Sequence, residues 1–231
     1  MKDKIAIILG ATGLTGGLVL ENLVNDDRYD KIKVFSRRPL DKKYNDKVEV
    51  ILCDLLKLEE QTERFTGDHV FCCIGTTRKK TPDKMRYRQI DYGIPLQAAE
   101  LCKKNGIDTF VVVSAIGANS KSKIFYNRTK GEMENDVLDI GLDNTYILRP
   151  SIITGERDET RIGERIGILI TKAVQSFLMG PFKKYRTISA EVIANAMIYV
   201  ANNGYEDAIL SSDIVELLGS GDHARKSHFG H

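Results

Sequence analysis

Residues 5–9 read Ile-Ala-Ile-Ile-Leu and lead directly into the turn Gly10-Ala11-Thr12-Gly13-Leu14-Thr15-Gly16. The apolar run predicts a strand buried on both faces, and the spacing of Leu14, Leu18 and Leu23 predicts a helix after the glycines. A helix that begins in this way leaves unpaired backbone N–H groups at its N-terminus, where the helix dipole also favours a phosphate group. The segment therefore predicts a nucleotide site; the alternative is a turn with a purely structural role.

Each glycine of this turn has an expected task. Gly10 would permit the tight turn, Gly13 would let a diphosphate approach the backbone, and Gly16 would let the helix pack close to the strand. The spacing is G-x-x-G-x-x-G rather than the G-x-G-x-x-G of the common dinucleotide fingerprint. The match is thus one of mechanism, strengthened by the strand before the turn and the helix after it.

Composition places the chain among ordinary globular proteins. It has 231 residues, of which 42% are hydrophobic and 29% charged, which suits one α/β domain with a full core. A net charge of +2 gives no electrostatic reason to expect a nucleic-acid partner. No apolar run is long enough to cross a membrane, and the first residues do not resemble a secretory leader. We expect no integral membrane segment and a cytoplasmic location.

The four cysteines are Cys53, Cys72, Cys73 and Cys102, and they show neither C-x-x-C spacing nor a partnering histidine cluster. We expect free thiols that behave as small hydrophobic residues, with no disulfide and no metal site. A redox pair at Cys72 and Cys73 is the alternative, but neighbours on a strand point to opposite faces.

Strand-like and helix-like segments alternate along the chain. Strands are expected at 31–36, 48–53, 69–74, 108–114 and 145–148, and helices at 83–105, 125–141, 166–179 and 189–202. This alternation predicts an α/β fold with a doubly wound parallel sheet. Residues 1–218 form the expected single domain, in which 150–185 break the pattern and form a small substrate-side cap. Residues 219–231 carry three histidines without periodicity and are expected to be a disordered tail.

A second group of residues suits proton transfer. Ser114 ends an expected strand at the sheet edge where open α/β sheets bind ligands. Tyr126 and Lys130 are four residues apart at the start of the next helix, so they share a face. A free tyrosine has a pKa near ~10. An ammonium beside it lowers that pKa, and a serine hydroxyl can orient a substrate oxygen. The alternative is an ordinary pair on a helix surface.

The end of the second strand indicates the cofactor. An NAD site usually has an acidic residue there, whereas this chain has Ser36-Arg37-Arg38. Guanidinium groups suit a 2′-phosphate, so the sequence favours NADP(H) over NAD(H). A solvated basic turn is the alternative. The expected cofactor-binding residues, which include an adenine contact at Asp54-Leu55 and a loop at Gly75-Thr76, are Gly10, Thr12, Gly13, Leu14, Thr15, Gly16, Ser36, Arg37, Arg38, Asp54, Leu55, Gly75, Thr76, Tyr126 and Lys130.

Taken together, these motifs resemble the short-chain dehydrogenase/reductase superfamily, specifically its atypical members with a G-x-x-G-x-x-G turn. The likeness covers about residues 4–205. The motifs Cys73-Ile74-Gly75-Thr76-Thr77-Arg78, Val113-Ser114-Ala115-Ile116-Gly117-Ala118, Lys130-Gly131-Glu132 and Leu148-Arg149-Pro150 look like the Tat-interacting-protein-like oxidoreductase branch.

The resemblance implies an NAD(P)-binding Rossmann domain and a catalytic role for three residues. Tyr126 would be the acid/base, Lys130 would bind the nicotinamide ribose and tune the tyrosine, and Ser114 would polarise the substrate. The helix asparagine of the superfamily has no clear match, and Asp91 lies near its place. Superfamily members are often homodimers.

The function that follows is an NADP(H)-dependent oxidoreductase, which transfers a hydride between nicotinamide and a small carbonyl or alcohol substrate. Two alternatives stay open. One is an NADP(H)-binding regulatory or redox-sensing protein with little turnover, and the other is an enzyme similar to nucleotide-sugar epimerases.

Overall fold

The computed structural model describes residues 4–40, 44–154 and 187–221. The expected helix at 166–179 and nearly all of the expected cap at 150–185 lie outside these ranges, as do the three histidines of the expected tail.

The described residues form one large parallel sheet with helices on both faces. Its strands are β1 (Lys4–Leu9), β2 (Tyr29–Ser36), β3 (Val48–Leu52), β4 (His69–Cys72), β5 (Thr109–Val113), β6 (Asn144–Arg149) and β9 (Ile209–Ser211). They are ordered β3-β2-β1-β4-β5-β6-β9, and every neighbouring pair is parallel. The order reverses between β1 and β4, which is where doubly wound folds bind nucleotides. A separate two-stranded parallel sheet joins β7 (Ile153–Thr154) to β8 (Ile188–Ser189).

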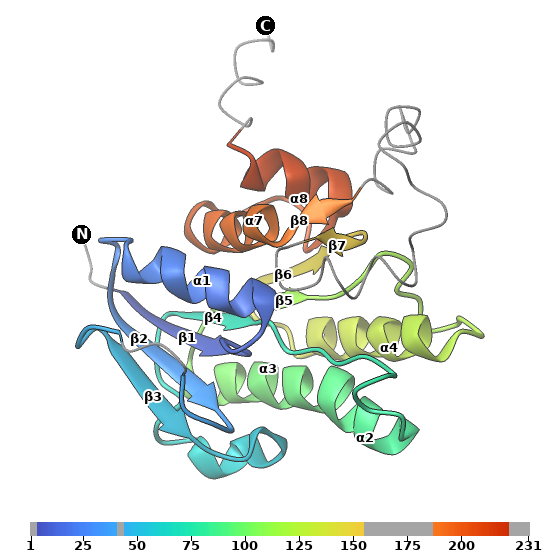
Figure 1. The fold of residues 1–231 in the computed structure, drawn as a ribbon, viewed down its shortest axis with the longest axis horizontal. Helices are drawn as coiled ribbons and strands as arrows, with labels where there is room; N and C mark the ends of the chain where they lie inside the picture. The colour runs from blue at the N-terminus through green and yellow to red at the C-terminus, as the bar shows by residue number, and fades with distance from the viewer. Residues whose placement is uncertain (1–3, 41–43, 155–186, 222–231) are drawn as a thin grey trace, which may run out of the picture.

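Two helical layers cover the sheet (Figure 1). One contains α1 (Leu14–Val24), α7 (Ala190–Asn203) and α8 (Ser212–Gly219). The other contains the 3-10 turns of η1 (Leu55–Gln61), α3 (Ile94–Asn105) and α4 (Phe125–Asp139). Alternate strand residues enter the two cores: Ala6 and Ile8 of β1 face the first layer, and Ile7 and Leu9 face the second. The expected doubly wound α/β fold is confirmed.

The helix expected over 83–105 is divided. It consists of α2 (Lys84–Arg88), a single π-helical turn η2 (Gln89–Gly93) and α3. Asp83 caps α2 by accepting from the Arg86 N–H, and Gly106 ends α3 in the left-handed conformation with φ of 68°. The widened turn η2 carries Asp91, a buried acidic residue. Such π-turns occur frequently at functional sites.

The boundary expected at residue 218 falls inside a helix. Gly219, which the sequence places at the start of the tail, is the last residue of α8 and packs against α7. A Cβ atom at Gly219 would lie 1.9 Å from the carbonyl oxygen of Val192, so the close approach of the two helices requires glycine there.

Candidate active site

A cleft of about 590 Å³ opens at the carboxyl ends of β1, β2 and β4. It lies where the strand order reverses, as expected for a nucleotide site. The residues that line it are Gly10, Thr12, Gly13, Phe35, Ser36, Arg37, Arg38, Leu55, Leu56, Cys73, Ile74, Gly75, Thr76, Lys80, Thr81, Arg86, Ile90 and Ile94.

The glycine turn has the geometry that a diphosphate cradle requires. Gly10 has φ of +92°, and a Cβ there would lie 2.7 Å from the carbonyl oxygen of Cys73. A Cβ at Gly16 would lie 2.2 Å from the carbonyl oxygen of Gly10, so α1 can start this close to the turn only without a side chain. Gly13 is the N-cap of α1 and supplies no side-chain cap, which leaves the first-turn N–H groups available to an anion. These residues fit a dinucleotide diphosphate.

The side chains that line the cleft make it strongly basic. The Ser36 hydroxyl donates to the carbonyl oxygen of Arg38 at 2.7 Å and thereby fixes the turn that carries Arg37 and Arg38. Lys80 and Arg86, which follow β4 in the chain, line the same cleft. No acidic side chain is among the described residues that line it, so the cleft suits a polyanion.

Several residues expected to bind the cofactor do not line this cleft. Leu14, Thr15 and Gly16 form the first turn of α1, behind the cradle. The Asp54 carboxylate accepts from the Leu56 N–H at 3.0 Å and caps η1, whereas Leu55 does line the cleft. Tyr126 and Lys130 lie on α4, outside the cleft lining.

Ser114 lies directly after β5 and is only 5% exposed. Its hydroxyl donates to Glu134 Oε1 at 2.5 Å. Arg149, at the end of β6, donates to both oxygens of the same carboxylate, at 3.0 Å from Nε to Oε1 and 2.5 Å from Nη2 to Oε2. The hydrogen bond from Arg149 to Glu134 raises the pKa of the guanidinium. This cluster joins β5, β6 and α4 at the carboxyl edge of the sheet.

Lys130 is buried next to that cluster. Its Nζ lies 3.4 Å from Asp91 Oδ1 and 3.4 Å from the carbonyl oxygen of Val113. The Thr76 N–H donates to Asp91 Oδ2 at 2.8 Å, so the pair is anchored to a residue that lines the cleft. Burial raises the pKa of Asp91, and Lys130 and the Thr76 N–H oppose this shift.

Tyr126 is the second residue of α4 and is 37% exposed. Burial raises the pKa of Tyr126, Lys130 lowers it and Asp91 raises it, with a net upward shift. Lys130 thus acts in the expected direction, but desolvation outweighs the ammonium and Asp91 opposes it, so the pKa of Tyr126 stays above its ordinary value. None of the described hydrogen bonds joins Tyr126 to Ser114 or Lys130.

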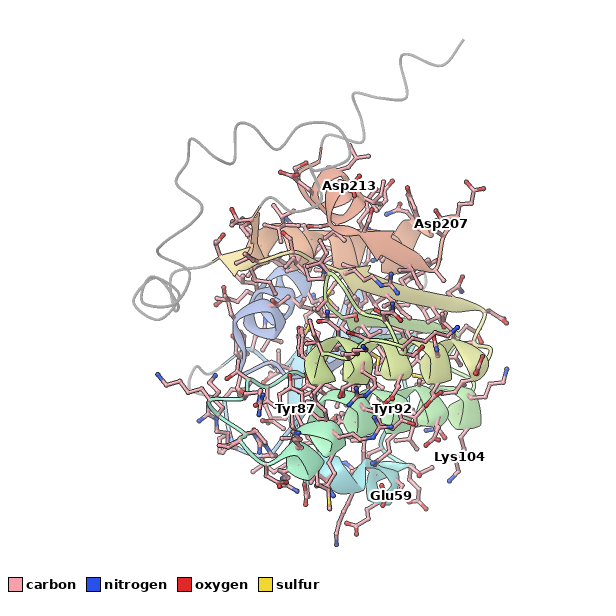
Figure 2. The ribbon with its side chains drawn as sticks, turned by 90° about the vertical axis from the view of Figure 1, so that its right-hand side faces the viewer. Glu59, Tyr87, Tyr92, Lys104, Asp207 and Asp213 are labelled. Carbon is pink, nitrogen blue, oxygen red and sulfur yellow. The ribbon has the colours of Figure 1, made fainter. Side chains whose placement is uncertain are left out.

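The sequence patterns predict no functional role for five residues at or near the site, which are Glu134, Arg149, Tyr87, Lys80 and Arg86. Tyr126, Lys130 and Glu134 recur every four residues on α4, so helical spacing was a usable signal for Glu134. The Tyr87 hydroxyl donates to the carbonyl oxygen of Thr76 at 3.2 Å. Tyr87 lies on the α2–α3 segment where this segment runs alongside α4 (Figure 2).

The four cysteines are free, as expected. Cys72 packs in one core and Cys73 against the other, so they occupy opposite faces of the sheet. Across the described ranges, no three His, Cys, Asp or Glu side chains form a group that could hold a metal ion. Within the same ranges, no helix is long and apolar enough to cross a bilayer.

Comparison with known proteins identifies the family. The sequence model of an NAD(P)H-binding family matches residues 10–203. The chain is 31% identical over 232 residues to a Debaryomyces hansenii protein named "Protein FMP52, mitochondrial", covering 96% of this chain and 98% of that one. It is 34% identical over 168 residues to "Protein HTATIP2" of Rattus norvegicus, covering 71% of this chain and 69% of that one.

Solved structures confirm the fold. MoeE5 in complex with UDP-glucose and NAD superimposes with a TM-score of 0.67 at 16% identity, covering 95% of this chain and 82% of that chain. A UDP-N-acetylglucosamine 4-epimerase from Methanobrevibacter ruminantium M1 gives a TM-score of 0.65 at 17% identity, covering 91% of this chain and 76% of that one.

The sequence relatives correct the expected cellular location. The FMP52 relatives, including one from Candida albicans at 31% identity over 93% of this chain, are named mitochondrial proteins, so the cytoplasmic expectation is wrong. With its matching family model, its full-length relatives and its sheet order, this chain belongs to the NAD(P)H-binding family and is an atypical short-chain dehydrogenase/reductase of the Rossmann type, close to the HTATIP2 branch.

Proposed function

We propose that this protein is an NADP(H)-dependent oxidoreductase that acts on a small carbonyl or alcohol. The observation that carries the proposal is a basic, phosphate-compatible cleft linked through Thr76 to a buried lysine on the same helix as Tyr126. Membership of the NAD(P)H-binding family supports a nicotinamide dinucleotide as the cofactor. The basic side chains that line the cleft support NADP(H), which carries the additional 2′-phosphate.

The preference for NADP(H) rests on the charge of the cleft. Arg37 and Arg38 are exposed on a turn that Ser36 holds in place, and Lys80 and Arg86 add positive charge from a different part of the chain. A 2′-phosphate carries the charge that Arg37 and Arg38 complement, and Lys80 and Arg86 add to the positive potential of the cleft. A carboxylate that would hold ribose hydroxyls is missing from the described lining, which disfavours NAD(H).

Bound NADPH would supply a hydride to the carbonyl carbon. Tyr126 would donate its phenolic proton to the carbonyl oxygen, as a general acid at a helix start exposed enough to meet a substrate. Lys130, four residues after Tyr126 on the same face of α4, would place a positive charge behind the general acid. Ser114 would lie near the substrate oxygen at the same sheet edge. Its hydroxyl would have to break its hydrogen bond to Glu134 before it could donate to a substrate carbonyl.

The cellular site is proposed from the relatives alone. Because the FMP52 proteins are named mitochondrial, we propose that this chain also works in mitochondria. Fractionation of cells that express the chain with a C-terminal tag tests this: co-purification with a matrix or membrane marker of mitochondria is expected, and recovery only with cytosolic markers would contradict it.

The activity is tested with purified protein, NADPH and a panel of aldehydes, ketones and quinones. Oxidation of NADPH that depends on a panel compound is the expected result. Tight NADPH binding without turnover on any compound would favour the regulatory alternative, and absence of binding to both pyridine nucleotides would overturn the proposal.

A further inference from the structure

Two cations that line the cleft have no acidic partner among the described residues. Lys80 precedes α2 and Arg86 lies on it, and both side chains are exposed. The described ion pairs include neither of them. The described hydrogen bond of the Arg86 guanidinium goes to the neutral Gln89 side chain at 3.4 Å. Exposed cations that line a pocket without a counter-charge are available to an anionic ligand.

Other basic residues of the same segment have tasks within the fold. Arg88 forms an ion pair with Glu132, and the Lys84 ammonium lies 5.8 Å from the centre of the Phe125 ring. These contacts join α2 to α4. The two cations of the cleft have no such task among the described residues.

Thr76 fixes the segment that carries the two cations. Its N–H donates to Asp91 Oδ2 at 2.8 Å, and its carbonyl oxygen accepts from the Tyr87 hydroxyl at 3.2 Å. Its hydroxyl lies 2.9 Å from the hydroxyl of Thr81, the residue after Lys80. All the polar groups of Thr76 are thus used within the protein. They hold the segment at the cleft before a ligand arrives, which lowers the entropic cost of binding.

The strand order separates the two pairs of cations in the cleft. Arg37 and Arg38 follow β2, Lys80 and Arg86 follow β4, and the glycine cradle at residues 10–13 follows β1. Since β1 lies between β2 and β4, the cradle lies between the two pairs. A dinucleotide that places its 2′-phosphate at the β2 side therefore runs over the cradle toward the β4 side. The charged group that it places there is its diphosphate.

We propose that Lys80 and Arg86 form a diphosphate subsite, which holds the cofactor phosphates against the cradle at residues 10–13. The proposal deepens the proposed function and rests on it for the identity of the ligand. The cradle supplies backbone N–H donors but no full charge, whereas each phosphate of the diphosphate is negatively charged. An ammonium and a guanidinium fork supply the counter-charge from the β4 side. Because NADH and NADPH share the diphosphate, this subsite adds affinity for both and does not choose between them.

The test is calorimetric titration of Lys80→Met/Arg86→Met and the wild type with two ligands. NADPH carries both the diphosphate and the 2′-phosphate, whereas adenosine 2′-monophosphate carries only the latter. The matched control is Arg78→Met/Lys79→Met, which removes the same charge from the same segment at two exposed residues outside the cleft lining. Circular dichroism establishes that each variant is folded.

In Lys80→Met/Arg86→Met the NADPH dissociation constant should rise by about 10-fold or more, because charge-assisted hydrogen bonds to the diphosphate are lost. The affinity for adenosine 2′-monophosphate should stay within about threefold, as should both affinities in the control, because salt screens more distant charges. If the double variant does not fold, Lys80→Met and Arg86→Met are measured singly, and each should weaken NADPH more than adenosine 2′-monophosphate.

Three results would overturn the proposal. One is an unchanged NADPH affinity in the variant. Another is an equal loss for both ligands, which would assign the two cations to the 2′-phosphate or to the general potential of the cleft. The third is a wild type that binds neither ligand.

The outcome is separable from that of the proposed function. The expected losses without turnover on any carbonyl would leave the diphosphate subsite intact and remove the oxidoreductase. Carbonyl turnover by the wild type, together with unchanged NADPH affinity in Lys80→Met/Arg86→Met, would keep the oxidoreductase and remove the subsite.

Discussion

The Ser114 hydroxyl donates a hydrogen bond to the buried carboxylate of Glu134, with 2.5 Å between Oγ and Oε1. The family resemblance implies that Ser114 polarises the substrate, yet in the structure its hydroxyl is hydrogen-bonded to a buried side chain of the protein. With its proton committed to a carboxylate, Ser114 can accept a hydrogen bond from an alcohol but cannot also donate one to a carbonyl. Glu134 in turn is held by Arg149, so the carboxylate organises the sheet edge at which the proposed chemistry takes place.

Replacing Glu134 should destabilise the fold. Glu134→Ala leaves Arg149 and Ser114 without their shared acceptor, and we expect a loss of about 3 kcal/mol in the free energy of unfolding. The matched control is Glu132→Ala on the same helix, which removes partly exposed ion pairs with Arg88 and Arg128 and should cost under ~1 kcal/mol. Urea unfolding followed by circular dichroism measures both free energies of unfolding. Equal losses in the two variants would show that the buried Glu134 cluster stabilises the fold no more than a surface ion pair does.

Removing the basic turn should change cofactor preference. In Arg37→Met/Arg38→Met, NADPH affinity should fall by roughly 10- to 100-fold, because charge-assisted hydrogen bonds to the 2′-phosphate contribute about 1.5–3 kcal/mol. NADH affinity should stay within about threefold of the wild type, since NADH lacks that phosphate.

The control for this change is Arg64→Met, because Arg64 pairs with Glu49 and does not line the cleft. Calorimetric titration with both nucleotides distinguishes the cases. A parallel loss of NADPH and NADH affinity in the double variant would argue that the arginines support the fold of the turn rather than the phosphate.

A buried histidine should make stability depend on pH. His69 is 6% exposed, and its Nδ1 lies 2.8 Å from the Tyr29 hydroxyl oxygen. The Asn202 amide donates to the same hydroxyl oxygen at 2.7 Å. Burial lowers the pKa of His69 to about 4 from an ordinary 6.5. The unfolded chain therefore binds a proton at His69 more readily than the folded protein does. The contribution of neutral His69 to the free energy of unfolding is complete above pH 6.5 and is lost as the pH falls toward 4.

The expected size of this effect is about 3 kcal/mol between those two pH values. His69→Gln should unfold with a shallower pH dependence than the wild type across this range. Carboxylates with lowered pKa values, such as Asp26 and Glu49, give a slope of the same sign in both proteins, so the difference between the two curves is the quantity to measure. Curves that run parallel from pH 6.5 to 4 would contradict the assignment.

The fold was predictable because its signals are local. The apolar run before Gly10 and the helical spacing after it identify β1, the turn and α1, and the alternation of later segments gives the parallel sheet. The short elements were missed for an equally physical reason. The three residues of β9 and the kinked η1 owe their structure to pairing and packing with distant segments, which no local pattern reports.

The site was predictable only in outline. Ser36, Arg37 and Arg38 could be placed at the cleft because strand ends meet at one edge of a parallel sheet. The contributions of Lys80 and Arg86 depend on how a loop folds back over that edge, and spacing does not reveal this. The pairing of Asp91 with Lys130 likewise depends on a π-turn inside a segment that reads as one continuous helix.

The most direct test of the account compares turnover and cofactor binding in Tyr126→Phe. The change removes the phenolic hydroxyl and keeps the ring, so the proposed acid is lost while the basic cleft is untouched. The account predicts a loss of NADPH-dependent carbonyl reduction by at least about 100-fold, with the NADPH dissociation constant changed less than about threefold. Turnover equal to that of the wild type would contradict it.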